Sequence, residues 1–228
     1  MSEEVIEVDL PGARVVFSTR LGGASEGPYE SLNLGILTDD ERDRVLANRD
    51  HLTSLLGLRE VAMGLQVHGT DMATWDGPST ALIEVDGHVT DRPGLALLVL
   101  TADCLPVALA APGRVAMLHC GWRGIAGGII AKGVGAFDEP PVAVVGPGIG
   151  QAHFEVGREV LEAFADVPDA ADGRMLDLRA VAEARLRAAG VQDVRHVDHC
   201  TYEREDLFFS HRRDGGVTGR QAGIAWLT

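Results

Sequence analysis

The chain of 228 residues is long enough to bury a core of its own, and we expect a single domain. Its apolar fraction of 46% and charged fraction of 24% are typical of a globular protein, and no apolar run reaches the roughly 18 residues of a membrane span. The formal net charge of -14 argues against general binding to nucleic-acid phosphates, which requires clustered Lys and Arg. An anionic ligand therefore needs a local positive site.

The N-terminal stretch MSEEVIEVDLPG is acidic and lacks the basic and apolar regions of a secretory signal. Cys104, Cys120 and Cys200 are an odd number of cysteines, which does not suit a disulfide framework. We therefore expect a cytoplasmic protein with free thiols. Neither a membrane nor a nucleic acid is expected as a partner, and the sequence does not identify protein partners.

Three segments have the apolar spacing of helices. The first follows Asp39 and Asp40 and ends at Gly57, with an apolar side formed by Val45, Leu46, Leu52, Leu55 and Leu56. The second covers Val156 to Ala165. The third is capped by Asp177 and closed by Gly190, with Leu178, Val181, Ala182, Leu186 and Ala189 on one side.

Four apolar runs rich in branched residues and bounded by Gly or Pro predict strands, at 95–100, 105–110, 114–119 and 142–145. The short link from Ala111 to Gly113 indicates a hairpin between the second and third of these strands rather than a helical crossover. The expected fold is α+β, with mixed or antiparallel sheets flanked by helices in one compact unit.

The predicted hairpin brings together two residues that can bind a metal. If it turns about position 112, the antiparallel register places Cys104 opposite His119. Directly opposed residues have Cα atoms about 4.5 to 5.5 Å apart, so thiol and imidazole can share one metal ion or one proton. A register error of one residue would separate them.

A third ligand must come from the remaining histidines. His68, in LQVHGTD, follows a short apolar run and precedes a glycine, as a ligand at the end of a strand would. The alternative is a strand-end histidine that makes an ordinary hydrogen bond. Spacing does not choose between His68 and the others, which we place on the polar side of the first helix (His51), in loops (His88, His153) and near the C-terminus (His196, His199, His211).

An ordered set of motifs runs nearly from end to end of the chain. It comprises FSTRLGG (17–23), SLNLG (31–35), NR (48–49), QVHG (66–69), TADCLPV (101–107), HCGWRG (119–124), GPGIG (146–150) and FFSHRRDGGVTGR (208–220). In these motifs the chain resembles the YfiH-type family, whose members are named polyphenol oxidases or laccases and also zinc-dependent purine nucleoside phosphorylases. Departures from the family pattern are Cys120 in place of a small residue, His211 in place of tyrosine, and the lack of a glycine before Asp39 and Asp40.

The resemblance implies that His68, Cys104 and His119 bind zinc. Two histidines and one cysteine leave the fourth tetrahedral position to water, as catalytic zinc sites do, and the metal lowers the pKa of that water toward 7. The implied reaction is cleavage of a purine nucleoside by phosphate to free base and ribose 1-phosphate, with adenosine deamination in some relatives. Activated water suits the deamination directly, whereas phosphate itself is the nucleophile of phosphorolysis.

The HCGWRG motif also predicts an anion site next to the metal. Gly121 and Gly124 permit close approach of a ligand to backbone, Arg123 adds a positive charge, and a helix over 125–137 would present its first amides. Under the alternative interpretation Trp122 packs in the core, Arg123 pairs with a surface carboxylate and the glycines form a turn.

Further candidates lie in the matched motifs. Asp103 adjoins Cys104 and is expected to orient a ligand histidine or bind substrate, unless it caps the following turn. Four other residues are candidates for binding phosphate or nucleoside, namely Arg20, Asn33, Asn48 and Arg49. The GPGIG motif lacks the spacing of a dinucleotide fingerprint or a P-loop, and we interpret it as a tight loop.

The residues also raise three rival functions. A laccase holds several coppers with paired His-x-His units, and the chain has no His-x-His. A metal-free cysteine hydrolase would use Cys104 as nucleophile with His119 or His68 as base. Its candidate substrate is a cell-wall precursor, because some proteins of the resembled family are named peptidoglycan editing factors. A purine-binding protein without turnover is the third rival, but three zinc-type ligands with an open position favour an enzyme.

Overall fold

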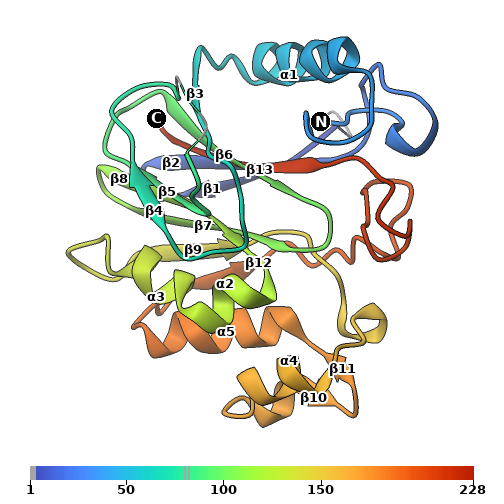
Figure 1. Ribbon diagram of the computed structural model, residues 1–228. Helices are drawn as coiled ribbons and strands as arrows, with labels where there is room; N and C mark the ends of the chain where they lie inside the picture. Colours follow the sequence, from blue (N-terminus) through green and yellow to red (C-terminus); the bar gives the residue numbers. More distant parts are fainter. Residues whose placement is uncertain (1–3, 80, 82) are drawn as a thin grey trace.

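The structure is a computed structural model that describes residues 4–79, 81 and 83–228, so the first three residues of the acidic N-terminal stretch lie outside it (Figure 1). Two sheets are stacked face to face, and helices cover both outer faces. Helix α1 (Arg42–Leu56) lies on one side, and α2 (Trp122–Gly127), α3 (Ile129–Val134) and α5 (Leu178–Ala188) lie on the other. Within the described ranges no helix is both long enough and apolar enough to cross a membrane.

The first sheet has five strands in the order β1-β2-β13-β6-β3. Its strands are β1 (Val5–Leu10), β2 (Ala13–Ser18), β13 (Gln221–Leu227), β6 (Leu95–Thr101) and β3 (Glu60–Ala62). All neighbours are antiparallel except β3 and β6, which run parallel. The C-terminal strand β13 therefore joins the N-terminal hairpin to the middle of the chain.

The second sheet has six strands in the order β12-β9-β7-β8-β5-β4. Its strands are β12 (Val194–His196), β9 (Val142–Val145), β7 (Leu105–Ala111), β8 (Arg114–Cys120), β5 (Gly87–Thr90) and β4 (Met72–Thr74). The two outermost pairs are parallel and the inner pairs antiparallel. A small hairpin of β10 (Ala171–Asp172) and β11 (Met175–Leu176) lies with α4 (Arg158–Ala163) at one end. The predicted α+β class with mixed sheets is confirmed.

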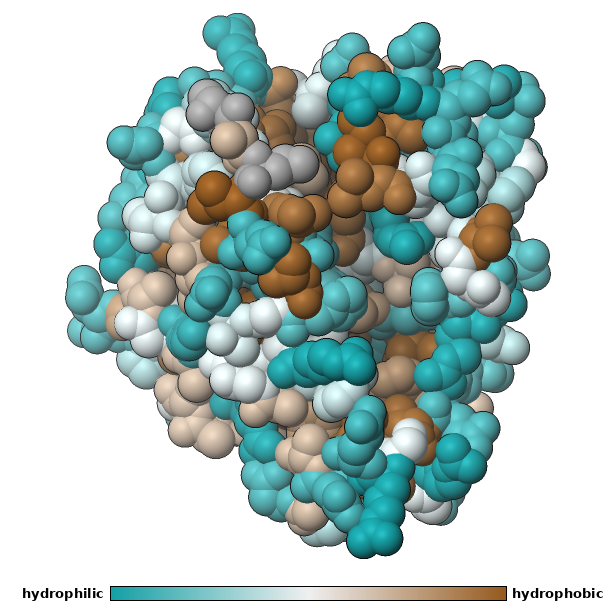
Figure 2. Space-filling view, viewed as in Figure 1, coloured by the Kyte–Doolittle hydropathy of each residue, from teal (hydrophilic) through white to brown (hydrophobic). Residues whose placement is uncertain are grey.

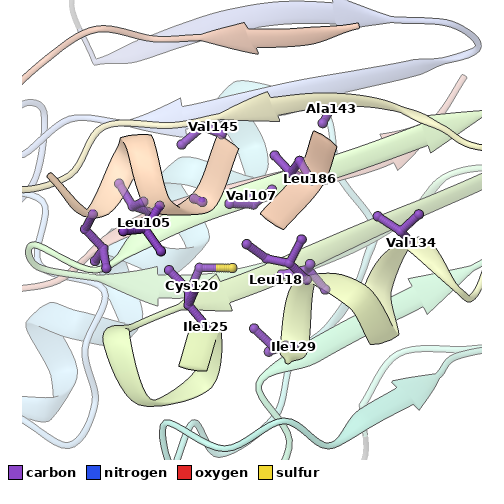
Figure 3. Packing of buried hydrophobic residues seen from close by; sticks show 14 of the residues in the cluster. Leu105, Val107, Leu118, Cys120, Ile125, Ile129, Val134, Ala143, Val145 and Leu186 are labelled. Carbon is purple, nitrogen blue, oxygen red and sulfur yellow. The ribbon is translucent and has the colours of Figure 1, made fainter. Parts of the chain in front are cut away.

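The core has three apolar layers. Phe17 and Leu97 of the first sheet meet Met117 of the second between the sheets. On the outer face of the first sheet, Leu52 of α1 belongs to a separate cluster. Figure 3 shows the third layer, where the sulfur of Cys120 lies among apolar side chains of the second sheet and its helices. Burial raises the pKa of the Cys120 thiol well above its ordinary value, so this cysteine is an inert core residue.

The predicted hairpin forms, but its register differs from the prediction. Ala111 pairs with Arg114 across a two-residue link, and His119 therefore pairs with Pro106. Gly113 takes a φ of 80°, which the tight link requires and a glycine permits. The prediction that Cys104 is directly opposite His119 was wrong by two residues. Cys104 instead lies just before the first residue of β7.

The helix predictions were confirmed in two cases. Helix α1 ends at Gly57, which has a φ of 67°, although it begins at Arg42 after Glu41 rather than at Asp39 and Asp40. Helix α5 follows Asp177, whose side chain accepts a hydrogen bond from the Ala180 amide.

Other element predictions need correction. The helix predicted over 156–165 is limited to α4. The one predicted over 125–137 is two short helices, because the chain turns at Gly128 with a φ of 95°. His88 was predicted in a loop, but it lies fully buried on β5.

Candidate metal centre

Three of the predicted site residues converge at one end of the second sheet. His68 follows β3 in the chain, Cys104 precedes β7, and His119 belongs to β8. Each offers one donor atom, and these atoms all lie within 4.8 Å of one another. The Sγ of Cys104 is 3.8 Å from Nε2 of His68, and the two imidazole rings meet edge to face at 4.8 Å. Such a group can hold a metal ion.

A buried carboxylate that the sequence analysis missed orients this group. Asp86 is fully buried, and its Oδ1 lies 2.7 Å from Nδ1 of His119. The same carboxylate accepts hydrogen bonds from the amides of Val67 (3.1 Å), His68 (3.0 Å) and Gly69 (2.7 Å). Because Nδ1 of His119 is engaged, Nε2 is left for the metal, the usual role of a carboxylate behind a ligand histidine. An acidic residue beginning a buried strand, in EVDGHV, was the available sequence signal.

The charges of the group favour a thiolate beside an imidazolium. Burial alone raises the pKa of Cys104. His119 and His68 outweigh this effect through their charges and hydrogen bonds, and they lower the pKa to about 6. Burial lowers the pKa of His119, whereas the Cys104 thiolate and the Asp86 carboxylate raise it to about 9. Asp86 keeps a pKa of about 2 because hydrogen bonds from His119 and the backbone outweigh its burial. A preformed thiolate suits metal binding and nucleophilic attack alike.

Backbone strain is concentrated at the group. His68 has a φ of 59° and Asp103 a φ of 89°, a left-handed conformation that non-glycine residues adopt at a cost. The Asp103 carboxylate accepts hydrogen bonds from Oγ1 of Thr201 (2.6 Å) and the amide of Arg212 (2.7 Å). These bonds leave the Asp103 carboxylate neither on a ligand histidine nor on the following turn, so these two expected roles were wrong. Asp103 ties the Cys104 segment to distant loops as a positioning residue, and its expected binding of substrate stays a prediction.

The glycines of HCGWRG allow close packing of the ligand segments. A Cβ on Gly121 would lie 2.8 Å from Cδ2 of His68 and 3.1 Å from Sγ of Cys104. A Cβ on Gly124 would lie 2.9 Å from the carbonyl oxygen of Gly69. The amide of Ile125, a predicted anion donor, is bonded within α2 to the Gly121 carbonyl at 3.0 Å. We therefore assign both glycines to packing rather than to an anion cradle.

A cleft of about 560 Å³ opens beside the three donor atoms. Four arginines contribute to its lining, namely Arg49, Arg123, Arg212 and Arg220. Its apolar lining includes Leu37, Leu65, Leu100, Trp122, Ile149 and Phe154. Apolar side chains on the face shown in Figure 2 gather in its upper half, below α1. The cleft therefore combines cations with apolar surface.

Arg123 and Trp122 fit neither sequence interpretation completely. The guanidinium of Arg123 is exposed and lies over the ring of Trp122, 4.4 Å from its centroid. Trp122 is partly buried and packs against the helix-side core. No carboxylate is paired with Arg123 among the residues described, so its charge stays available at the cleft.

Arg220 is a cleft residue that the sequence analysis missed. Burial lowers its pKa, while the nearby negative charges of Cys104 and Asp103 raise it. Its Nη1 donates to the carbonyls of Thr218 (2.9 Å) and Gly219 (2.8 Å), which fixes the guanidinium in the cleft wall. The residue belongs to the quoted C-terminal motif, but nothing local marks it among that motif's arginines.

Arg20, Asn33 and Asn48 lie outside the cleft lining. Arg20 donates to the Glu30 carbonyl at 2.6 Å and lies over the ring of Phe209. Asn33 and Asn48 are buried and use their amides within the surrounding loops. The structure therefore gives these three predicted substrate-binding residues a bracing role.

Arg49 alone of the four candidates from the early motifs lines the cleft. Its Nε and Nη2 donate to the Leu34 carbonyl at 2.9 and 2.7 Å, so part of its hydrogen-bonding capacity is used in the fold. Burial lowers its pKa.

Taken together, the fold and the site define an α+β protein of two stacked mixed sheets with a Cys-His-His group in the lining of a cleft that also carries four arginines. The chain belongs to the family described as multi-copper polyphenol oxidoreductase laccase, whose profile matches residues 14–228. The family resemblance read from the motifs is thereby confirmed.

Named relatives cover nearly the whole chain. It is 40% identical to "Purine nucleoside phosphorylase YfiH" of Escherichia coli over 95% of this chain and 94% of the relative. A purine nucleoside phosphorylase of Streptomyces coelicolor is also 40% identical, over 95% of this chain and 96% of its own.

Solved structures share the fold. A Neisseria meningitidis protein is 35% identical with a TM-score of 0.89, over 98% of this chain and 99% of its own. The YfiH protein of Bacillus licheniformis is 31% identical with a TM-score of 0.90, over 95% of this chain and 93% of its own.

Proposed function

We propose that this protein is a zinc-dependent purine nucleoside phosphorylase that converts inosine or adenosine and phosphate into free base and ribose 1-phosphate. The observation that carries the proposal is the Cys-His-His group in the lining of a cleft that also contains arginines and apolar side chains. The names of relatives 40% identical over nearly the full chain support the same reaction.

The donor set fits zinc. Zinc bonds of about 2.3 Å to sulfur and about 2.0 Å to nitrogen at a tetrahedral angle separate the two donors by about 3.5 Å. The observed distance from Cys104 Sγ to His68 Nε2 is 3.8 Å, close to this separation. Bound zinc would act as a Lewis acid and activate water, which also suits the adenosine deaminase activity that we include in the proposal.

Different residues of the cleft would bind the phosphate and the purine. Phosphate is a dianion, and Arg123 and Arg220 supply the cations at the cleft. The purine ring requires apolar and aromatic surface, which Trp122 and Leu37 provide. Phosphate held there can attack the sugar as the glycosidic bond breaks and positive charge develops on the ring.

Two observations bear on the rival functions, a multicopper oxidase and a cysteine hydrolase. A multicopper oxidase needs many histidine ligands, whereas the described residues form two groups of three donors, each with one cysteine. The lowered pKa of Cys104 beside His119 does favour a cysteine hydrolase as the second candidate. Elemental analysis separates these cases, because the proposal expects about one zinc at His68, Cys104 and His119 and the hydrolase none.

The reaction is tested by incubating purified protein with inosine, with and without phosphate, and measuring hypoxanthine. We expect release only with phosphate, and equal release without it would indicate hydrolysis instead. Arg123→Ala should raise the KM for phosphate about tenfold or more with a smaller change in the KM for inosine. Arg158→Ala, which removes an exposed arginine paired with Glu162 on α4, is the matched control and should change neither.

A further inference from the structure

A second group of metal-binding side chains lies away from the first. His153, Cys200 and Glu203 each offer one donor atom, and these atoms all lie within 4.8 Å of one another. His153 closes the short helix that follows the GPGIG motif, and the other two lie in the turn after β12. Nε2 of His153 is 3.0 Å from Oε1 of Glu203. Imidazole, thiol and carboxylate thus meet from two segments far apart in the sequence.

The surrounding backbone holds these donors in place. The amide of Gly150 donates to Sγ of Cys200 at 3.2 Å, and a Cβ on Gly150 would lie 3.1 Å from that sulfur. Gly148 forms a parallel bridge with Cys200. The GPGIG loop therefore leaves room for the Cys200 thiol and donates a hydrogen bond to it. The spacing of the motif did not predict this role.

The imidazole is fixed independently of any metal. The ring of His153 stacks on that of Tyr202 with centroids 4.1 Å apart and an interplanar angle of 9°. Its backbone carbonyl accepts a hydrogen bond from Nη1 of Arg212 at 3.3 Å. A side chain held in this way loses little freedom when it binds a ligand, which favours affinity.

We propose that His153, Cys200 and Glu203 form a second binding site for a divalent cation of the zinc type. Nitrogen, sulfur and carboxylate oxygen are the three donor types that zinc accepts, and water would complete a tetrahedron. A thiolate donor disfavours magnesium and calcium, which prefer oxygen. His153 and Cys200 are partly buried and Glu203 is exposed, so the site is open to solvent. Binding would release the thiol proton to solvent.

The second site would brace one wall of the cleft. Thr201, next to Cys200, donates to the Asp103 carboxylate at 2.6 Å, and Asp103 precedes Cys104. Arg212 of the cleft lining bonds to the His153 carbonyl. A cation that links the short helix after the GPGIG loop, through His153, to the turn after β12 thus stabilises the segments that position Cys104 and Arg212. The inference stands apart from the proposed reaction, because metal binding alone tests it.

Cobalt replacing zinc reports each site by its thiolate, because a cobalt-thiolate bond absorbs in the near ultraviolet. We expect the metal-free full chain to bind two Co²⁺ with this absorption, and Cys104→Ser and Cys200→Ser each to bind one. Cys104→Ser/Cys200→Ser should show none. His196→Ala is the matched control, since His196 also lies 3.0 Å from a carboxylate, that of Glu183, with no thiol grouped with it, and it should retain both signals.

Circular dichroism establishes that each variant is folded before titration. The second site is refuted if folded Cys104→Ser shows no cobalt-thiolate absorption. It is also refuted if the double variant Cys104→Ser/Cys200→Ser keeps the absorption that Cys104→Ser shows. If Cys200→Ser shows none while Cys104→Ser keeps its signal, the second site stands and the metal centre of the proposed function fails. Glu203→Gln should weaken the Co²⁺ affinity of Cys104→Ser about tenfold or more, and unchanged affinity would remove Glu203 from the site.

Discussion

Two buried polar networks, one around Asp86 and one around Asn48, differ in whether they leave a polar atom free to bind a ligand. Asp86 accepts hydrogen bonds from three amides and His119, and the second nitrogen of that histidine remains free to face Cys104. Asn48 accepts from the amide of Ala24 at 2.7 Å, and its own amide donates to Ser25 and to two carbonyls. The first network positions metal-binding atoms at the cleft, whereas the second uses its polar atoms in hydrogen bonds within the loops.

The comparison shows how to interpret polar residues in a family motif. Asn48 and His68 both lie in matched motifs, and the sequence made both of them candidates for the site. In the fold, the polar atoms of Asn48 are consumed by the loop that it braces, while the Nε2 of His68 is 3.8 Å from a thiol. A motif residue belongs to a site when the fold leaves its polar atoms unsatisfied toward a cavity.

The largest expected effect comes from removing a donor. His68→Ala takes one ligand from the metal model but leaves Cys104 and His119 together for a cysteine hydrolase. We expect a folded protein that loses most of its zinc and at least about 100-fold in activity. Zinc content and turnover are measured on one preparation. Loss of zinc with full activity would break the link between the group and the reaction.

Asp86→Asn should have the next largest effect, because it removes the charge behind His119. We expect metal binding to weaken roughly 10- to 100-fold, measured by competition with a chelator. Asp91→Asn removes a surface carboxylate paired with Arg114 and is the control, with an expected stability change below about 1 kcal/mol and normal zinc content. Equal affinity in the two variants would contradict the role given to Asp86.

Asn48→Ala should separate stability from the site. Its buried partners would lose their hydrogen bonds, and at about 1 to 3 kcal/mol for each unsatisfied group we expect a loss of about 3 to 4 kcal/mol. Denaturant unfolding measures that loss, and zinc per folded chain should stay unchanged. A variant that unfolds like the parent but binds no zinc would place Asn48 at the site instead.

A smaller effect is expected from pH at His88, a buried histidine on β5 close to Asp86 that does not belong to the Cys-His-His group. Burial lowers its pKa to about 4, against a weaker raising effect of Asp86. The unfolded chain takes up a proton below about pH 6.5 and the folded one does not, so this stability is complete above that pH and falls as pH drops toward 4. Between pH 7 and pH 5 the expected loss is about 2 kcal/mol.

His88→Gln provides the comparison for this titration. Nε1 of Trp75 donates a hydrogen bond to Nδ1 of His88 at 3.1 Å. A glutamine at this position still offers an acceptor for that bond, but it does not take up a proton in this pH range. Urea unfolding of both proteins at several pH values should give a flatter curve for the variant. Parallel curves would show that His88 does not titrate in this range.

The sequence predicted those parts of the site that depend on local pattern. The hairpin of β7 and β8 and the grouping of Cys104 with His119 follow from apolar runs and a short turn. The register error was two residues, an even number that preserves the face of the sheet, and the donor atoms still lie within 4.8 Å of one another. Helix caps at Gly57 and Asp177 were predictable for the same local reason.

Residues whose roles depend on distant partners escaped prediction. Asp86 binds amides at 67 to 69 and a histidine 33 positions further on, and no local pattern encodes that meeting. Strand β13 was missed although it is central to its sheet, because its partners β2 and β6 lie far away in sequence. The cleft position of Arg220 depends on that same pairing. Likewise, nothing in GPGIG indicates that its last glycine admits Cys200.

Chelation and reconstitution of the native enzyme test the central claim most directly. Metal is stripped from the purified protein, and phosphate-dependent release of hypoxanthine from inosine is followed as zinc is returned. We predict that the stripped protein is inactive and that activity returns with about one zinc per chain bound at His68, Cys104 and His119. Full turnover by the stripped protein, together with a covalent adduct trapped on Cys104, would contradict this account and identify a cysteine hydrolase.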